Sequence, residues 1–395
     1  MKRSVDWTLL FCAIILSMIG VLLIYSASPD SNLWLKQLIY VVVGIVLMIV
    51  IARIPMRVHY SLGWIYYGLI LVVLTVALFQ SGEIKRWIHL GPLGFQPSEF
   101  AKLAVVLVIS RYLTDRKRDI EHHKTVLISI LIIAIPFAIV MGQPDLGTAV
   151  VFIVILGACL YAAGLNELYL FLFMTPLLSL VSNVHWLLWA IFFIFLLFVL
   201  WKSRIGLWMF LMVTIGNLIV GITTPAIWNN LHEYQKERIL VFLDPSRDPF
   251  GAGYQIIQSK IAVGSGQFWG KGFLAGTQTR LAFLPAKHTD FIFAVLAEQF
   301  GFIGSFIVLA IFLLMFYRIL KIADESRNIY NRLVAIGIGA TLFFGAFVNI
   351  GMVTGIMPVT GLPLPFLSSG GSSLIASFAM IGILLNIYSH RVEGP

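Results

Sequence analysis

Apolar stretches close to 20 residues long, separated by short polar or basic segments, recur along the whole sequence. About 20 apolar residues is the length that an α-helix needs to cross the hydrocarbon core of a bilayer. The stretches lie at residues 7–26, 33–51, 61–79, 98–113, 125–142, 146–163, 167–182, 184–201, 205–227, 290–317, 332–357 and 370–388. This pattern predicts an all-α polytopic membrane protein with about twelve spans, forming one integral membrane domain over residues 1–395.

The composition agrees with a membrane protein and argues against a nucleic-acid partner. The chain is 59% hydrophobic and 11% charged, which is too apolar for a soluble domain of this length. The net charge is +9, but no basic stripe or nucleic-acid motif accompanies it. We therefore interpret the charge as an orientation signal with an attraction to anionic lipid, and expect no nucleic-acid partner.

Basic residues favour one orientation of the spans. With the amino terminus in the cytoplasm, every basic short segment falls inside, as does the carboxyl terminus, and the positive-inside rule is satisfied. The outer face then receives residues 80–97, 143–145, 358–371 and the large loop 228–289. That large loop is also basic, but long loops are translocated largely regardless of charge, so its cations become candidates for binding an anion at the outer face.

Ionisable residues gather at the predicted outer ends of the spans. Glu99 and Lys102 open the fourth span, Asp145 opens the sixth, and Asp290 opens the tenth, with Glu298 about two turns deeper. A charge in a membrane segment is costly and is a functional candidate by default. Any one of these residues could simply cap a helix or neutralise a neighbour, since Glu99 and Lys102 share a helix face. Several at one depth beside a cationic loop favour a site.

Short motifs run along most of the chain around these residues. They are Arg86-Trp87-Ile88, Gln96-Pro-Ser-Glu-Phe-Ala-Lys102, Gln143-Pro-Asp-Leu-Gly-Thr148, Tyr234-Gln-Lys-Glu-Arg238, residues 251–266 with Gln258-Ser-Lys260, Gly270-Lys-Gly272, Gly276-Thr-Gln278, residues 283–298, Asn349-Ile-Gly-Met-Val353 and residues 358–365. With these motifs the chain resembles the SEDS family of shape, elongation, division and sporulation proteins. The last two motifs resemble its elongation members rather than its division members.

The match to the family has three departures. The family core has about ten spans, so residues 165–202 read as an additional transmembrane hairpin. Ser369 stands where the family usually has Tyr, and Gln267 replaces a customary Gly. None of these departures touches the acidic residues described above.

The resemblance implies an activity, a location and partners. It implies a peptidoglycan glycosyltransferase that polymerises lipid II, a disaccharide-peptide on undecaprenyl pyrophosphate, at the outer face of the bacterial cytoplasmic membrane during elongation and rod-shape maintenance. It implies a class B penicillin-binding protein as transpeptidase partner, together with other membrane proteins of the elongation complex. By match to the family's motif, Asp290 carries over as the essential catalytic residue, and Trp87, Glu99, Lys102 and Asp145 carry over as residues of an outer cavity.

The chemistry leaves two roles open for Asp290. Glycosyl transfer from a lipid pyrophosphate needs deprotonation of the acceptor hydroxyl, charge stabilisation on the departing pyrophosphate, and a groove for two prenyl tails. A positioned carboxylate can supply the first of these. With Thr289 as a cap, the helix dipole favours the ionised carboxylate of Asp290, whereas burial disfavours it. Asp290 is therefore either a base or a ligand of a divalent cation, Mg²⁺ or Mn²⁺.

Nearby cations offer a route without a metal. Arg280, Lys287, Lys271 and Lys102 could bind the pyrophosphate directly. His288 could orient Asp290. The expected substrate-binding residues are Trp87, Glu99, Lys102, Asp145, Arg280, Lys287, His288 and Glu298.

Two features of the large loop have less specific interpretations. The glycines in residues 264–272 predict a re-entrant loop that turns tightly. Residues 230–242 predict an amphipathic helix on the outer leaflet, which either gates lipid entry or serves as a connector.

Two other functions compete with the enzyme. A flippase would place polar residues near the midplane, with internal repeats and broken helices. Here the charges gather toward one face and the sequence shows no repeat, which favours an outer-face enzyme. A non-catalytic scaffold of the elongation complex would leave the acidic residues without an explanation.

Overall fold

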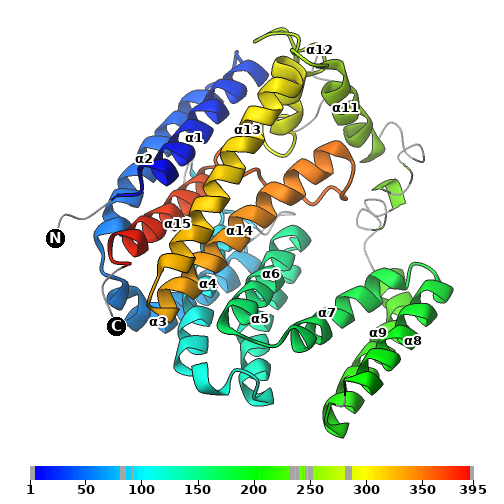
Figure 1. The fold of residues 1–395 in the computed structure, drawn as a ribbon. Coiled ribbons are helices and arrows are strands. Elements are labelled where there is room, and N and C mark those ends of the chain that lie inside the picture. The colour runs from blue at the N-terminus through cyan, green and yellow to red at the C-terminus, as the bar shows by residue number, and fades with distance from the viewer. Residues whose placement is uncertain are drawn as a thin grey trace. The chain divides into compact units, whose positions relative to one another are not determined.

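Each predicted span is an α-helix in the structure. The structure is a computed structural model that describes residues 5–80, 86–90, 93–203, 205–230, 236, 240–242, 244, 247, 252–280 and 287–391. These helices are α1 Trp7–Ala27, α2 Leu33–Arg53, α3 Met56–Leu78, α4 Pro97–Asp115, α5 His123–Gly142, α6 Leu146–Ala163, α7 Glu167–Ser182, α8 Trp186–Lys202, α9 Leu207–Asn230, α13 Ile292–Glu325, α14 Ile329–Thr354 and α15 Gly371–Ser389. Figure 1 labels these helices along the chain.

Within the described residues, nine helices are long and apolar enough to cross a membrane. Helices α7 and α8 are as apolar but shorter, at 16 and 17 residues, which corresponds to about 25 Å of helix. Helix α4 is long enough, but it carries Glu99, Lys102, Arg111 and Asp115. The chain is a multi-pass membrane protein with an all-α fold.

Smaller elements lie between the spans. A 3-10 helix, Lys117–Asp119, precedes α5. Strands β1 (Ile88–Leu90) and β2 (Leu93–Phe95) form an antiparallel hairpin with Ile88 opposite Phe95, directly before α4. Helices α11 (Ala252–Ser265) and α12 (Thr277–Arg280) lie in the predicted large loop. The predicted amphipathic helix at 230–242 falls mostly outside the described residues.

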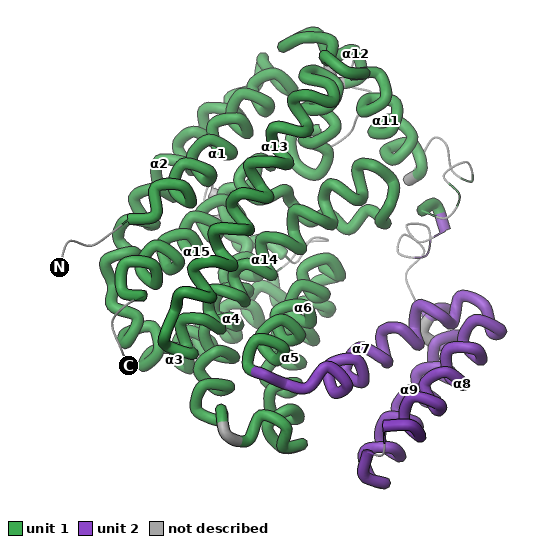
Figure 2. Tube along the Cα trace, viewed as in Figure 1, with its two compact units in different colours: residues 1–163, 241–395 green, residues 164–240 purple. Residues whose placement is uncertain are grey.

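The chain divides into two compact units, coloured separately in Figure 2. Unit 2, Gly164–Leu240, contains α7, α8 and α9. Its apolar centre is formed by Leu172, Leu196 and Leu200. Asn217 Nδ2 of α9 donates a hydrogen bond to Thr175 Oγ1 of α7 at 3.0 Å. The hairpin predicted at 165–202 is thus formed by α7 and α8, and it packs with α9 in one unit.

In unit 1, close packing depends on glycines at two contacts, one between α2 and α15 and one between α1 and the chain just before α15. A Cβ on Gly382 of α15 would lie 2.7 Å from the carbonyl oxygen of Met48 in α2. A Cβ on Gly20 of α1 would lie 2.7 Å from the carbonyl oxygen of Leu367. Small residues of this kind let membrane helices approach closely. Helices α2 and α15 accordingly lie side by side in Figure 1.

Helix α13 is not one continuous span, which corrects the prediction for residues 290–317. It consists of two helical segments joined at Gly301, whose φ of 64° and ψ of −157° are accessible essentially to glycine alone. The first segment, residues 292–300, is buried at every position through Gln299, whereas a helix facing lipid would alternate. This segment is therefore enclosed by protein on all sides.

The glycine loop, residues 266–272, supplies the hydrogen bonds that the break removes. The amides of Lys271 and Gly272 donate to the carbonyl oxygens of Glu298 and Gln299 at 3.0 and 2.9 Å. The amides of Phe302 and Ile303 donate to carbonyl oxygens of the glycine loop at 2.8 and 3.2 Å. Non-helical backbone at membrane depth is tolerated when protein satisfies it in this way. The tight loop predicted from the glycines is present.

Helix α1 is fixed to α13 at both of its ends. Near its carboxyl end, Ser26 Oγ donates to Gln299 Oε1 at 2.8 Å. At its amino end, the carboxylate of Asp6 accepts from Arg318 Nε at 3.0 Å. Unit 1 therefore has one end near the break in α13 and another end some 30 Å of helix away.

Candidate functional site

Asp290 lies in a turn, the Asp290 turn (residues 287–291), which directly precedes α13. The helix begins at Ile292 with Phe291 at the N-cap, and no side chain caps it. The prediction that Asp290 would sit in the first helical turn behind a Thr289 cap is therefore wrong. The helix starts two residues later, and Asp290 precedes it.

Three hydrogen bonds fix the backbone of the Asp290 turn. Asn349 Nδ2 of α14 donates to the carbonyl oxygen of Asp290 at 3.0 Å. Ser368 Oγ donates to the carbonyl oxygen of Thr289 at 2.6 Å, and the Ser369 amide donates to that of His288 at 2.8 Å. Ser368 and Ser369 belong to residues 358–370, which we call the Pro-Gly segment. The turn is thus held by side chains and backbone from distant parts of the chain.

The carboxylate of Asp290 lies against the same Pro-Gly segment. A Cβ on Gly361 would be 3.8 Å from Asp290 Oδ2. Gly361 has a φ of 76°, a conformation that side chains rarely adopt. Asp290 itself is half-buried.

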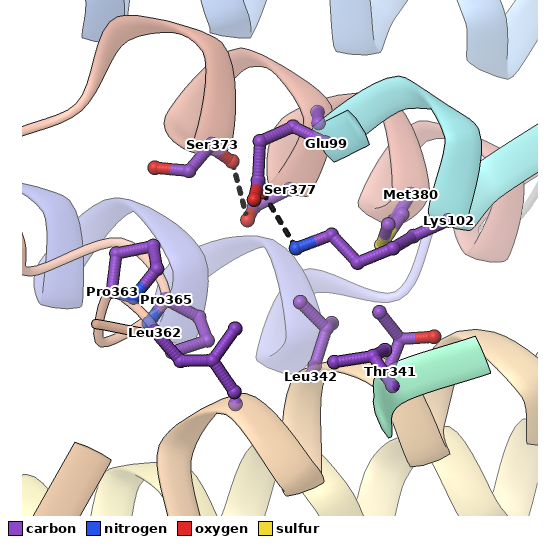
Figure 3. A pocket seen from close by; sticks show the side chains of 13 residues that line it. Glu99, Lys102, Thr341, Leu342, Leu362, Pro363, Pro365, Ser373, Ser377 and Met380 are labelled. Atoms are coloured by element: carbon purple, nitrogen blue, oxygen red, sulfur yellow. Dashed lines mark hydrogen bonds and ion pairs between the residues drawn. The ribbon is translucent and has the colours of Figure 1, made fainter. Parts of the chain in front are cut away.

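A cavity begins at the next residues of the Pro-Gly segment. Leu362, Pro363 and Pro365 line it together with residues of α4, α6, α14 and α15. Figure 3 shows that Glu99 and Lys102 of α4 point toward one another in its wall, with Lys102 Nζ 2.7 Å from Glu99 Oε2. Both side chains are at most 9% exposed. Asp290 and the predicted Glu99–Lys102 pair are therefore connected by one short segment.

Asp145 caps helix α6 at its amino end. Its Oδ1 accepts from the Thr148 amide at 3.2 Å and its Oδ2 from Thr148 Oγ1 at 3.0 Å. Gln96 Nε2, just before α4, donates to Oδ2 at 3.4 Å. A Cβ on Gly147 would lie 2.9 Å from the carbonyl oxygen of Thr360 in the Pro-Gly segment. Asp145 thus has the capping role that the sequence left open, and it sits beside the elements of the site.

Trp87 directly precedes the hairpin that leads to α4. A Cβ on Gly94 would be 3.2 Å from its ring, so the ring covers that strand. The preceding Arg86 donates from Nε to the carbonyl oxygen of Gln143 at 3.1 Å. The hairpin is thereby tied to the turn that holds Asp145.

Lys287 and His288, which were both predicted to bind substrate, lie in the Asp290 turn. Burial lowers the pKa of Lys287. Burial, and to a smaller extent the charge of Lys287, lowers the pKa of His288, which favours its neutral form. Arg280 ends α12, and its side chain lies outside the described part of the structure.

Glu298 is separate from the cavity. It is fully buried, and its Oε1 accepts from Lys271 Nζ at 3.0 Å, Thr277 Oγ1 at 3.2 Å and the Gln278 amide at 2.9 Å. Lys271, a predicted pyrophosphate ligand, is therefore paired with Glu298. Contact of either residue with a substrate stays a prediction.

The side chains near Asp290 can be compared with those that a divalent cation requires. No group of three or more His, Cys, Asp or Glu side chains with metal-ligand spacing occurs among the described residues. Magnesium, however, is commonly held by one or two carboxylates together with substrate phosphates and water. Asp290 fits a cation only in that shared mode.

Sequence reasoning missed the residues that position the site. The elements of the site are connected by Asn349, Ser368, Gln96 and Ser372. For instance, the Gln96 amide donates to Ser372 Oγ at 2.9 Å. Asn349 stands in a motif quoted above, but its partners are 13 and 59 residues away in the chain. No local pattern identifies such contacts.

Comparison with known proteins gives matches over nearly the whole chain. A family model for cell cycle proteins of the FtsW, RodA and SpoVE type matches residues 6–191 and 188–393. The peptidoglycan glycosyltransferase MrdB of Escherichia coli K12 is 39% identical over 399 residues, covering 99% of this chain and 95% of that protein. The peptidoglycan glycosyltransferase RodA of Treponema pallidum is 33% identical, covering 98% of each.

A solved structure is similar over the same length. One chain of a peptidoglycan synthase complex, described as coordinating polymerization and crosslinking, is 30% identical with a TM-score of 0.76. The match covers 99% of each chain, so it includes α7 and α8.

Proposed function

We infer the function of this chain from its family, since the chain belongs to the cell cycle proteins of the FtsW, RodA and SpoVE type. It is a peptidoglycan glycosyltransferase that polymerises lipid II. Its motifs at residues 349–353 and 358–365 and its similarity to MrdB and RodA support a role in elongation and rod-shape maintenance.

One observation carries the assignment of the catalytic residue. The Asp290 residue is half-buried, its backbone is fixed by three hydrogen bonds, and its carboxylate adjoins the segment that lines the cavity. A base must be held in place to contribute its typical rate factor of about 10² to 10⁴. Among the described residues, the other predicted site carboxylates, Glu99, Asp145 and Glu298, are buried, whereas Asp290 is half-buried.

The reaction can be written with these residues. Asp290 accepts the proton of the acceptor hydroxyl, and the hydroxyl oxygen attacks the anomeric carbon of the donor sugar. The bond from that carbon to the pyrophosphate oxygen breaks, and undecaprenyl pyrophosphate leaves with the electron pair. Lys287, Arg280 and Lys102 stabilise its charge, and His288 orients Asp290. A divalent cation, if bound, would be held by Asp290 and substrate phosphate and would act as a Lewis acid.

The membrane location is proposed from the basic segments. We place both termini in the cytoplasm and the Asp290 turn at the outer face of the bacterial cytoplasmic membrane, since the positive-inside rule is met at each short basic loop. Lipid II would reach the cavity from the outer leaflet.

The partners are proposed from a different finding. Similarity to a chain of a complex that combines polymerization with crosslinking supports a class B penicillin-binding protein as transpeptidase partner. Other elongation-complex membrane proteins follow from the elongation role.

The test uses purified full-length protein, alone and with its cognate penicillin-binding protein, given labelled lipid II with and without a chelator. We expect glycan ladders from the wild type and at least a 100-fold loss, on the order of the contribution of a general base, in Asp290→Asn. The substitution is nearly isosteric, so the protein should stay folded. Glu121→Gln, an exposed residue at the opposite side of the predicted topology, is the matched control and should form normal ladders.

Each contrary result has a distinct meaning. Near-normal ladders from Asp290→Asn would refute the catalytic assignment. No ladder from the wild type in the presence of its partner, together with transfer of lipid II across vesicles, would favour the flippase. The broken α13 is a feature that transporters also use, so the transport measurement belongs in the same experiment.

A further inference from the structure

Glu298 is a buried carboxylate that the proposed reaction does not use. It is 0% exposed and lies in the enclosed first segment of α13, six residues after its start. A carboxylate buried in this way is costly unless it is paired and hydrogen-bonded. Its partners therefore indicate what the residue is for.

Three partners of the Glu298 carboxylate come from one stretch of the loop before the Asp290 turn. Lys271 Nζ, Thr277 Oγ1 and the Gln278 amide converge on the single oxygen Oε1 at 2.9 to 3.2 Å. Lys271 Nζ also donates to Thr277 Oγ1 at 2.7 Å. One carboxylate oxygen thus joins the glycine loop to the start of α12.

The backbone around Glu298 reinforces the same connection. The Lys271 amide donates to the carbonyl oxygen of Glu298 at 3.0 Å. That oxygen can accept this bond because the break at Gly301 removes its helical donor. A Cβ on Gly270 would lie 2.2 Å from the carbonyl oxygen of Gln299, so the loop lies directly on the segment. The Gln299 side chain accepts a hydrogen bond from Ser26 of α1.

We propose that Glu298 is a positioning residue that fixes residues 271–278 to the helical segment following Asp290, and that it acts through Lys271 and Thr277 without touching lipid II. This inference rests on the proposed function. Residues 271–280 lead toward the Asp290 turn, and the segment 292–300 follows that turn directly. Glu298 therefore ties together the two stretches of chain that flank the catalytic residue.

The kinetic test separates positioning from substrate contact. Glu298→Gln keeps an oxygen that can accept from Thr277 and Gln278 but removes the charge that pairs with Lys271. We expect kcat to fall about tenfold with KM within about twofold, and Glu298→Ala to lose more. The double variant with Lys271→Met should lose no more than the worse single variant, because both changes break one interaction.

The matched control is the double variant that combines Glu298→Gln with Glu99→Gln. Glu99 pairs with Lys102, whereas Glu298 pairs with Lys271, so their fold-losses should multiply. If Glu298→Gln and Lys271→Met multiply as well, or if the loss is entirely in KM, Glu298 contacts substrate and the proposal is overturned.

A second readout does not depend on activity. Trypsin cleavage of the intact protein in detergent at Lys271 or Arg280 should be about tenfold faster in Glu298→Ala and unchanged in Asp290→Asn, provided that both elute as folded monodisperse protein. Loss of activity in Glu298→Ala with unchanged cleavage would overturn the proposal. If the wild type makes no glycan, the proposed function fails, and the cleavage result still decides whether Glu298 holds the loop.

Discussion

The two ends of unit 1 each contain a buried carboxylate paired with a cation, yet the surrounding backbone differs. Asp6 N-caps the regular helix α1 and binds Arg318 from a regular stretch of α13. Glu298 lies beside a break in α13 and binds Lys271 and Thr277 from a loop. A pair between two regular helical stretches can fix their packing only. A pair between a broken helix and a loop also fixes the loop, so the same chemistry can serve stability at one end and catalysis at the other.

The largest expected effect comes from removing the break itself. Gly301→Ala should abolish polymerisation, because a Cβ there would lie 2.3 Å from the Gly270 amide nitrogen and φ is 64°. Glycan ladders and thermal unfolding would measure it. Gly68→Ala in α3, where a Cβ meets nothing within 4 Å, is the control and should be neutral or slightly stabilising. Full activity in Gly301→Ala would mean that the broken helix has no role.

Asp6→Asn should separate stability from rate at the opposite end. Asparagine keeps the N-cap acceptor for Leu9 but leaves Arg318 without its carboxylate, so we expect a loss of about 3 kcal/mol of stability with kcat of the folded protein unchanged. Thermal unfolding and single-concentration ladders on monodisperse protein would measure both. A tenfold fall in kcat would contradict the contrast drawn between the two ends.

Glu99→Gln tests whether breaking a buried ion pair within one helix lowers the polymerisation rate, as is expected for the Glu298–Lys271 pair. The change leaves Lys102 as an uncompensated charge in the cavity wall, so we expect about a tenfold lower polymerisation rate, and a similar loss for Asp145→Asn. Initial rates against Glu121→Gln would measure this. Equal losses in all three variants would indicate general destabilisation instead.

The smallest effect is expected for Glu325→Gln. Glu325 pairs with Arg391 at 3.1 Å near the Asp6 end, but about a third of its side chain is exposed. Exposed pairs contribute less than about 1 kcal/mol, so stability and polymerisation rate should both stay close to the wild type. A large loss of rate here would show that the Asp6 end also affects catalysis.

Local patterns in the sequence were sufficient for much of the fold. The positions of the spans follow from apolar length, which depends on nothing beyond the stretch itself, and each predicted stretch is a helix. The motifs identified the family, and the glycines at 264–272 indicated a tight loop. The proximity of Glu99, Lys102, Asp145 and Asp290 followed from counting which span ends share a face.

The tertiary structure alone decided what those residues contact. Sequence showed Glu298 only as a carboxylate in an apolar helix, and the residue would look the same whether it faced a substrate or Lys271. The break at Gly301, the pre-helical position of Asp290 and the bonds from Asn349 and Ser368 depend on segments that meet only after folding, such as Ser26 and Gln299, 273 residues apart. A hydrogen bond requires two atoms at about 3 Å, and periodicity along one segment carries no information about which distant segment will supply the second atom.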